Sequence, residues 1–194
     1  MKIVCLGDSM TSGYGVRRGE SWIELLNARS RHQLINAGIA GDTASGMLAR
    51  LRSDVFPHKP CMALIMGGYN DIFLQNGFDC AKSHIAAIAH QCVSAGIVPV
   101  IGIPIPIMPH ELNPWSSLMD SKHAVQLADD YCNWLKCFAK VFRFSYIDLH
   151  TPFKAYVSER GSNAYLSDGI HPSAAGHLLI AREIESFLSE RFGG

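Results

Sequence analysis

Short apolar runs rich in β-branched residues alternate along this chain of 194 residues with longer segments in which apolar residues recur at helical spacing. Parallel strands need long crossover connections and are buried on both faces, so this alternation is typical of a parallel sheet covered by helices on both sides. It predicts an α/β fold. Five runs are expected to be strands: Lys2–Leu6, Leu34–Ala37, Met62–Met66, Val98–Ile103 and Ser145–Leu149.

The segments between the expected strands carry helix-start signals. Asp42, Asp79, Asp120 and Pro172-Ser173 are each suited to begin a helix. The sequence has no internal repeat, low-complexity tract or charge block, so we expect a single domain over residues 1–194. The expected helices are Ser21–Ala28, Thr43–Ser53, Cys80–Ala95, Ser121–Ala139 and Ser173–Phe192.

One long segment, residues 104–120, fits neither helix nor strand because four prolines interrupt it. Loops of this length in a domain are usually functional or disordered. Two interpretations stay open. The segment is either a passive crossover from the fourth strand to its helix, or a loop that covers the substrate.

The charge balance excludes one class of partner. The chain has 17 Lys and Arg against 17 Asp and Glu, which leaves no excess of cations to neutralise a phosphate backbone. No uninterrupted apolar run approaches the roughly 20 residues that cross a bilayer. We therefore expect no nucleic-acid binding and no stable membrane insertion; the oligomeric state stays open.

Cysteine spacing and the N-terminal pattern both bear on the cellular location of the protein. None of the six cysteines forms a C-x-x-C pair, and Cys5 and Cys61 lie in or beside apolar strand-like runs, so we expect reduced thiols. The apolar segment at the N-terminus is too short for a secretory signal. We expect a cytoplasmic protein, or a secreted one if a leader has been removed.

Chemistry-bearing residues follow the expected strands, where ligands of open parallel sheets bind. Ser9 follows the first strand, within Gly7-Asp8-Ser9. Gly41 follows the second strand, and Asn70 and Asp71 follow the third. Asp168-Gly169-Ile170-His171 comes after the fifth strand, just before the last helix.

These residues suit nucleophilic catalysis. The hydroxyl of Ser9 can attack a carbonyl only if a base removes its proton, and His171 can both accept and return a proton within one cycle. Asp168, three residues earlier, can bond the other ring nitrogen and fix the tautomer. We therefore predict Ser9 as nucleophile, with His171 and Asp168 completing a triad.

The same chemistry needs hydrogen-bond donors aimed at the oxyanion of the tetrahedral intermediate. Three candidates follow the first three strands: the backbone N–H of Ser9, the backbone N–H of Gly41 and the side-chain amide of Asn70. We predict that they form an oxyanion hole.

Taken together, Gly7-Asp8-Ser9, Gly41, Gly68-x-Asn70-Asp71 and Asp168-x-x-His171 resemble the four ordered blocks of the SGNH hydrolase superfamily, also called the GDSL lipase/esterase family. The first and last blocks are most similar to the thioesterase I/lysophospholipase L1 branch. The resemblance implies a flavodoxin-like three-layer α/β/α sandwich with strand order 2-1-3-4-5 over essentially the whole chain. It also implies the triad and oxyanion roles given above. Residues 72–122 carry no motif of the family.

Alternative roles exist for several of these residues. Asp8 and Asp71 could react or bind a metal, but we interpret Asp8 as shaping its turn through local hydrogen bonds and Asp71 as orienting the loop beside Asn70. Thr11-Ser12-Gly13 suggests a phosphate loop, yet no complete phosphate-binding motif occurs. Ser9 lacks the second glycine of the G-x-S-x-G elbow, which argues against a general α/β-hydrolase. Arg50-x-Arg52 is expected to be solvated charge.

We therefore predict a serine hydrolase that cleaves carboxylic esters or thioesters, of acyl ester, lysophospholipid or arylester type, and that uses no metal or cofactor. Its partner is expected to be a small ester or thioester molecule. Two alternatives stay open: a carbohydrate acetyl esterase, and a non-catalytic flavodoxin-like binding module. Apolar and aromatic side chains expected to contact the substrate are Tyr14, Tyr69, Phe73, Ile107 and Trp115.

Overall fold

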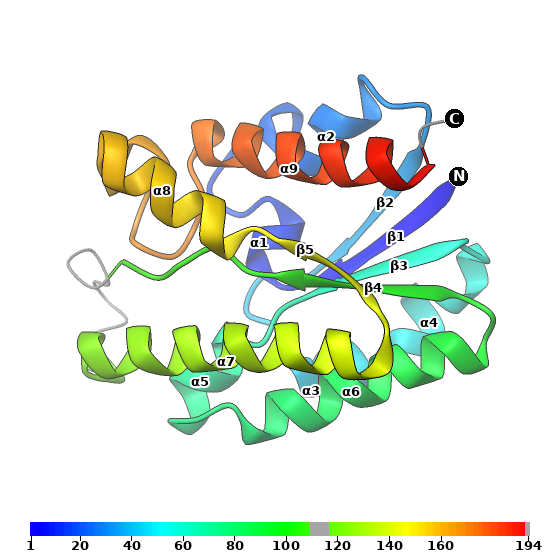
Figure 1. Cartoon of the computed structure of the whole chain (residues 1–194), viewed down its shortest axis with the longest axis horizontal. Coiled ribbons are helices and arrows are strands. Elements are labelled where there is room, and N and C mark those ends of the chain that lie inside the picture. Colours follow the sequence, from blue (N-terminus) through cyan, green and yellow to red (C-terminus); the bar gives the residue numbers. More distant parts are fainter. Residues whose placement is uncertain (109–116, 193–194) are drawn as a thin grey trace.

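The computed structural model describes residues 1–108 and 117–192 and is built on one five-stranded parallel sheet of order β2-β1-β3-β4-β5 (Figure 1). This order confirms the arrangement that the family resemblance implies. Each expected strand is present within one residue at either end. The strands are β1 Lys2–Gly7, β2 Gln33–Gly38, β3 Met62–Met66, β4 Val98–Ile103 and β5 Ser145–Asp148.

Helices cover both faces of the sheet, as expected for parallel strands (Figure 1). One face carries α2 Trp22–Asn27 and α9 Ala174–Phe192. The opposite face carries α6 Asp79–Ser94 and α7 Ser121–Phe142, with α3 Ala44–Ala49 packed beside α6. The remaining short elements are α1 Ser9–Ser12, η1 Arg18–Glu20, α4 Leu51–Asp54, η2 Phe56–His58, α5 Tyr69–Gln75, α8 His150–Arg160 and η5 Ser162–Ala164.

Three expectations about helices need correction. Thr43 rather than Asp42 caps α3, since the Thr43 hydroxyl accepts a hydrogen bond of 3.2 Å from the backbone N–H of Gly46. The single helix expected over Thr43–Ser53 is divided into α3 and α4 at Arg50, whose backbone leaves helical geometry. Asp79 does not cap α6, because it is already the first helical residue. Asp120 does cap α7, as expected, since its carboxylate accepts a hydrogen bond of 3.0 Å from the backbone N–H of His123.

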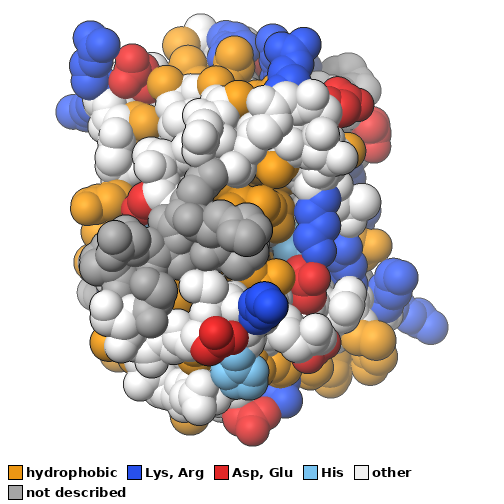
Figure 2. All heavy atoms as spheres, turned by 90° about the vertical axis from the view of Figure 1, so that its left-hand side faces the viewer, with side chains coloured by type: hydrophobic (Ala, Val, Ile, Leu, Met, Phe, Trp, Pro, Cys, Tyr) orange, Lys and Arg blue, Asp and Glu red, His pale blue; other side chains and the backbone are white. Residues whose placement is uncertain are grey.

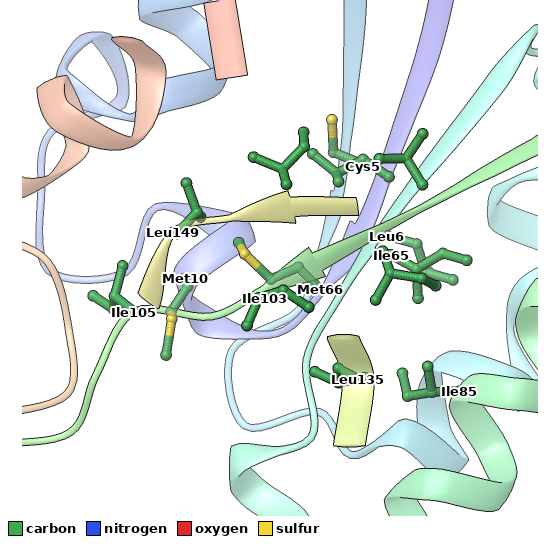
Figure 3. Close-up of a cluster of buried hydrophobic side chains, with 14 of the residues drawn as sticks. Cys5, Leu6, Met10, Ile65, Met66, Ile85, Ile103, Ile105, Leu135 and Leu149 are labelled. Atoms are coloured by element: carbon green, nitrogen blue, oxygen red, sulfur yellow. The ribbon is translucent and has the colours of Figure 1, made fainter. Parts of the chain in front are cut away.

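The central strands form the core. Every residue of β3 is buried, and so are residues 3–7 of β1, which explains their continuous apolar sequences. Figure 3 shows side chains of the strands packed against those of α6 and α7. This packing fixes the carboxyl ends of the strands at one edge of the sheet, on the left of Figure 1. The labelled core residues are Cys5, Leu6, Met10, Ile65, Met66, Ile85, Ile103, Ile105, Leu135 and Leu149.

In the described part of the chain, no helix is both long and apolar enough to cross a membrane.

Candidate active site

Ser9 begins a single helical turn, α1, directly after β1. The carboxylate of Asp8 caps this turn and accepts a hydrogen bond of 3.1 Å from the backbone N–H of Met10. Gly13 ends the turn in the left-handed conformation, with φ of 84°, where its N–H reaches the carbonyl oxygen of Ser9. The turn therefore holds the serine at the carboxyl edge of the sheet.

The loop before α9 carries His171 and Asp168. One carboxylate oxygen of Asp168 accepts hydrogen bonds from the backbone N–H groups of Ile170 (3.1 Å) and His171 (2.8 Å). The other oxygen lies 2.6 Å from Nδ1 of His171. The Asp168 carboxylate therefore fixes the loop through the backbone N–H groups that it accepts from, and the imidazole ring through Nδ1 of His171.

The imidazole of His171 links this loop to the nucleophile turn. Its Nε2 lies 2.9 Å from Oγ of Ser9, and both side chains are buried. Because Asp168 can only accept at Nδ1, the ring carries its proton there and Nε2 is free to accept the hydroxyl proton of Ser9.

The electrostatics of Asp168 favour a permanent carboxylate. Burial alone would raise its pKa, but the hydrogen bonds from the side chain and backbone of His171 outweigh burial and hold the pKa below its usual value. A negative charge therefore stands beside Nδ1 and would stabilise an imidazolium.

Gly41 and Asn70 lie across the same cavity from His171. Gly41 adopts φ of +81°, a conformation that L side chains rarely adopt, in a turn closed by a 3.1 Å bond from Asp42 N–H to Ile39 O. Asn70 is the second residue of α5, and its Nδ2 donates to the carbonyl oxygen of Asp42 at 2.8 Å.

Ser9, Gly41 and Asn70 thus face one cavity of about 360 Å³. Among the described residues, the backbone hydrogen bonds of the two turns leave the N–H groups of Ser9 and Gly41 without a partner. Two backbone donors and one amide are therefore available to a bound oxygen atom. The described lining residues are Ser9, Tyr14, Ala40, Gly41, Asn70, Asp168 and His171.

Comparisons with known proteins show which family the chain belongs to. The model of the GDSL-like lipase/acylhydrolase family matches residues 5–179. The chain belongs to this family. The family model includes the segments of all four motifs, from the Ser9 turn to the loop of His171.

Relatives of this GDSL-family chain carry several esterase names. An acetylxylan esterase of Geobacillus stearothermophilus is 28% identical over 81% of this chain and 71% of its own length. Thioesterase 1/protease 1/lysophospholipase L1 of Escherichia coli is 38% identical, but over only 36% of this chain and 34% of its own length. The homologues thus include esterases and a thioesterase.

Solved structures share the fold over nearly the whole chain. A GDSL-like lipase of Bacteroides thetaiotaomicron superposes with a TM-score of 0.79 at 22% identity, covering 98% of this chain and 89% of that one. A lipolytic protein of the G-D-S-L family from Veillonella parvula gives a TM-score of 0.78 at 19% identity, covering 97% and 98% of the two chains.

The two acidic residues next to the motif residues accept hydrogen bonds from backbone N–H groups, Asp8 within its own turn and Asp71 from a residue 27 positions away along the chain. Asp71 accepts from the backbone N–H of Ala44 at 2.9 Å, as Asp8 does from Met10. Burial raises the pKa of Asp8 to about 7, although the hydrogen bond from Met10 and the nearby His171 both lower it. Burial likewise raises the pKa of Asp71.

The expected substrate contacts are largely corrected. Tyr14 does line the cavity, with its ring centroid 4.7 Å from that of His171. Tyr69, Phe73 and Ile107 are buried in the core and are not among the described lining residues. The hydroxyl of Tyr69 donates a hydrogen bond of 2.8 Å to the carbonyl oxygen of Ile105.

Trp115, the fifth residue expected to contact substrate, lies outside the described residues, as does most of the proline-rich segment. Ala40, which lines the cavity beside Gly41, was not among the predicted substrate contacts. Arg50 was expected to be solvated, whereas its side chain is largely buried. No local pattern signals either role, because both depend on how β1 and β2 end side by side.

No three His, Cys, Asp or Glu side chains within residues 1–108 and 117–192 are grouped as a metal ion would require.

Proposed function

We propose that this GDSL-family protein hydrolyses carboxylic esters through an acyl-enzyme intermediate on Ser9. The observation that carries the proposal is the continuous chain from Ser9 Oγ through His171 to Asp168, with separations of 2.9 and 2.6 Å, on one cavity with Gly41 and Asn70. A nucleophile, its base, the group that orients the base and a set of donors therefore meet at one place.

In the first step, Oγ of Ser9 attacks the ester carbonyl carbon while its proton passes to Nε2 of His171. The carbonyl oxygen becomes an oxyanion within reach of three donors: the N–H of Ser9, the N–H of Gly41 and Nδ2 of Asn70. The leaving alcohol or thiol then takes the proton from His171 as its bond to carbon breaks.

In the second step, water gives a proton to Nε2 of His171 and attacks the acyl carbon. Collapse of this intermediate returns the proton to Oγ of Ser9 and releases the carboxylic acid. Asp168 stays ionised throughout and stabilises the imidazolium in both halves of the cycle. Each step uses side chains and backbone N–H groups of this chain, and water.

The cavity favours a short acyl group. Its volume, as the described residues bound it, is about 360 Å³, near the lower end for ligand pockets, and Tyr14 and Ala40 are the hydrophobic side chains among the described lining residues. Tyr69 and Phe73, which would extend an apolar channel, are packed in the core instead. We therefore infer that acetyl to butyryl esters are turned over faster than long-chain esters.

The neutral charge balance favours an uncharged substrate, because a balanced surface does not steer charged molecules strongly. Figure 2 shows the face at the carboxyl edge of the sheet: some hydrophobic side chains are visible near its centre, and charged side chains of both signs lie around them. An uncharged acyl ester suits this surface better than the polyanionic acyl-CoA.

A carbohydrate acetyl esterase is the second candidate. The observation that favours it is the acetylxylan esterase relative, whose similarity extends over 81% of this chain. Axe2, an acetylxylan esterase from Geobacillus stearothermophilus, also superposes with a TM-score of 0.74 at 23% identity, over 97% of this chain and 93% of its own. The chemistry at Ser9 would be the same, with a sugar hydroxyl as leaving group.

A chain-length series tests these proposals. Hydrolysis of p-nitrophenyl acetate, butyrate, octanoate and palmitate, and of acetyl-CoA and palmitoyl-CoA, is measured with the wild type. We expect kcat/KM to be highest for acetate or butyrate and lowest for palmitate. A maximum at octanoate or palmitate contradicts the short acyl pocket, and release of acetate from acetylated xylan without p-nitrophenyl ester turnover favours the second candidate.

A further inference from the structure

Arg50 ends α3 and directs its side chain to the carboxyl ends of β1 and β2, where only 13% of the side chain is exposed. Its guanidinium donates four hydrogen bonds. Nε binds a carboxylate oxygen of Asp42 at 2.7 Å, and Nη1 binds Ala37 O at 2.7 Å and Asp54 Oδ2 at 3.0 Å. Nη2 binds Gly7 O at 2.9 Å. Each of the three guanidinium nitrogens therefore donates at least one hydrogen bond.

Three of these partners belong to the segments that carry the proposed oxyanion donors. Gly7 is the last residue of β1, two residues before Ser9. Ala37 lies next to the last residue of β2, and Asp42 directly follows Gly41. One side chain thus connects the turn of Ser9 with both sides of the turn that contains Gly41.

Asp42 extends the connection to the third donor. Its carboxylate is held by Arg50, while its backbone carbonyl accepts the hydrogen bond from Nδ2 of Asn70 at 2.8 Å. This bond uses one amide hydrogen of Asn70 and directs the other. The orientation of Asn70 therefore depends on where Arg50 holds Asp42.

We propose that Arg50 is a positioning residue for the oxyanion hole: it sets the distances among the N–H of Ser9, the N–H of Gly41 and the amide of Asn70. The inference rests on the proposed function. Arginine is required because a planar fork can bind a carboxylate and several carbonyl oxygens at fixed angles, whereas the single ammonium of lysine cannot. Small displacements of such donors weaken transition-state stabilisation more than substrate binding.

The test compares Arg50→Lys with Arg52→Lys. Arg52 lies two residues away, is exposed and is absent from the cavity lining, so it is a matched control. With p-nitrophenyl acetate we expect Arg50→Lys to lower kcat roughly 10- to 100-fold with KM within about threefold of the wild type. Arg52→Lys should retain wild-type kcat. Equal kcat for Arg50→Lys and the wild type overturns the inference.

Asp42→Asn provides a second variant if Arg50→Lys unfolds. It removes the charge that Arg50 binds but keeps the backbone carbonyl that Asn70 needs. We expect kcat to fall, again with little change in KM, at a temperature well below the measured Tm. A kcat within twofold of the wild type in folded Asp42→Asn overturns the proposal.

A double-mutant cycle separates positioning from general loss of stability. If Arg50 acts through Asn70, the combined loss in Arg50→Lys/Asn70→Ala is smaller than the product of the two single losses. Full multiplication of the losses contradicts the coupling. Wild-type protein that neither hydrolyses esters nor reacts with a fluorophosphonate at Ser9 contradicts the proposed function itself, which is a different outcome from an active wild type with a fully active Arg50→Lys.

Discussion

Nε2 of His171 lies 2.9 Å from Oγ of Ser9, although 162 residues separate the two along the chain. The fold creates this contact. Ser9 follows the inner strand β1, and the loop of His171 returns to the same edge after β5 and α8. The candidate site therefore depends on the parallel order of the sheet, in which all strands end at one edge.

Replacing Asn70 by alanine tests the oxyanion hole. Loss of one donor that acts only in the transition state should lower kcat about 10²- to 10³-fold with little change in KM. Gln75→Ala is the control, because Gln75 is exposed at the end of the same helix. Steady-state kinetics on p-nitrophenyl acetate measure both. A loss of tenfold or less in Asn70→Ala means that the oxyanion is held elsewhere.

The ring of Tyr14 is the described aromatic side chain that the structure leaves free to contact substrate. It is 54% exposed and lies between Gly13 and Gly15, with its centroid 4.7 Å from that of His171. Because aromatic contacts contribute about 0.5–1.5 kcal/mol, we expect Tyr14→Ala to raise KM for a p-nitrophenyl ester roughly 2- to 10-fold. Tyr14→Phe keeps the ring and should keep KM. An unchanged KM in Tyr14→Ala removes the residue from the binding site.

The buried carboxyl of Asp8 predicts a pH dependence of stability. Its pKa is raised to about 7 in the folded protein, against about 4 for an exposed aspartate. The folded state therefore binds more protons than the unfolded state between these values, and the contribution of Asp8 to stability is present below about pH 4 and is lost as the pH rises through 7.

Asp8→Asn removes this titration while keeping an oxygen that can accept from Met10 N–H. We expect the free energy of unfolding to fall less in the variant than in the wild type between pH 5 and pH 8, by on the order of 2 kcal/mol. Urea denaturation at both pH values measures the difference. Asp79→Asn, at an exposed helix start, serves as control. Parallel pH profiles for wild type and Asp8→Asn contradict the raised pKa.

The strands could be predicted almost to the residue because a buried parallel strand is marked by a continuous apolar run. Met62–Met66 is such a run and was found at its predicted bounds. Short helices could not be predicted. The single turn α1, Ser9–Ser12, contains three residues with weak helix preference, Ser9, Thr11 and Ser12, and is capped by Asp8. In α8, His150–Arg160, the apolar residues Phe153, Tyr156 and Val157 do lie at helical spacing, but the stretch is short, is otherwise mostly polar and has Pro152 in its first turn.

The positions of the polar motif residues at the site could be predicted more readily than those of the residues around them. Ser9, Gly41, Asn70 and His171 each follow a strand or precede the last helix, so topology alone brings them to one edge. The side chains that line or support the cavity depend on burial instead. Tyr69 was expected to contact substrate and lies in the core, because burial is decided by distant packing partners such as Cys132 and the Ile105 carbonyl.

The prediction for Arg50 was wrong in the opposite sense, because a side chain expected in solvent is largely buried. A charged residue on a predicted helix is normally expected to be solvated. The hydrogen-bond partners Gly7, Ala37 and Asp42 of Arg50 are 43, 13 and 8 residues away along the chain. Only the adjacent endings of β1 and β2 bring these oxygen atoms around one guanidinium. A buried polar network of this kind has no local sequence signature.

The most direct test of the account is the turnover of p-nitrophenyl acetate by Ser9→Ala. Ser12→Ala is the matched control, since Ser12 belongs to the same helical turn but does not line the cavity. At a Tm close to that of the wild type, Ser9→Ala should lose roughly 10⁴-fold or more of kcat while Ser12→Ala stays active. Turnover by folded Ser9→Ala within tenfold of the wild type would contradict the assignment of Ser9 as the nucleophile.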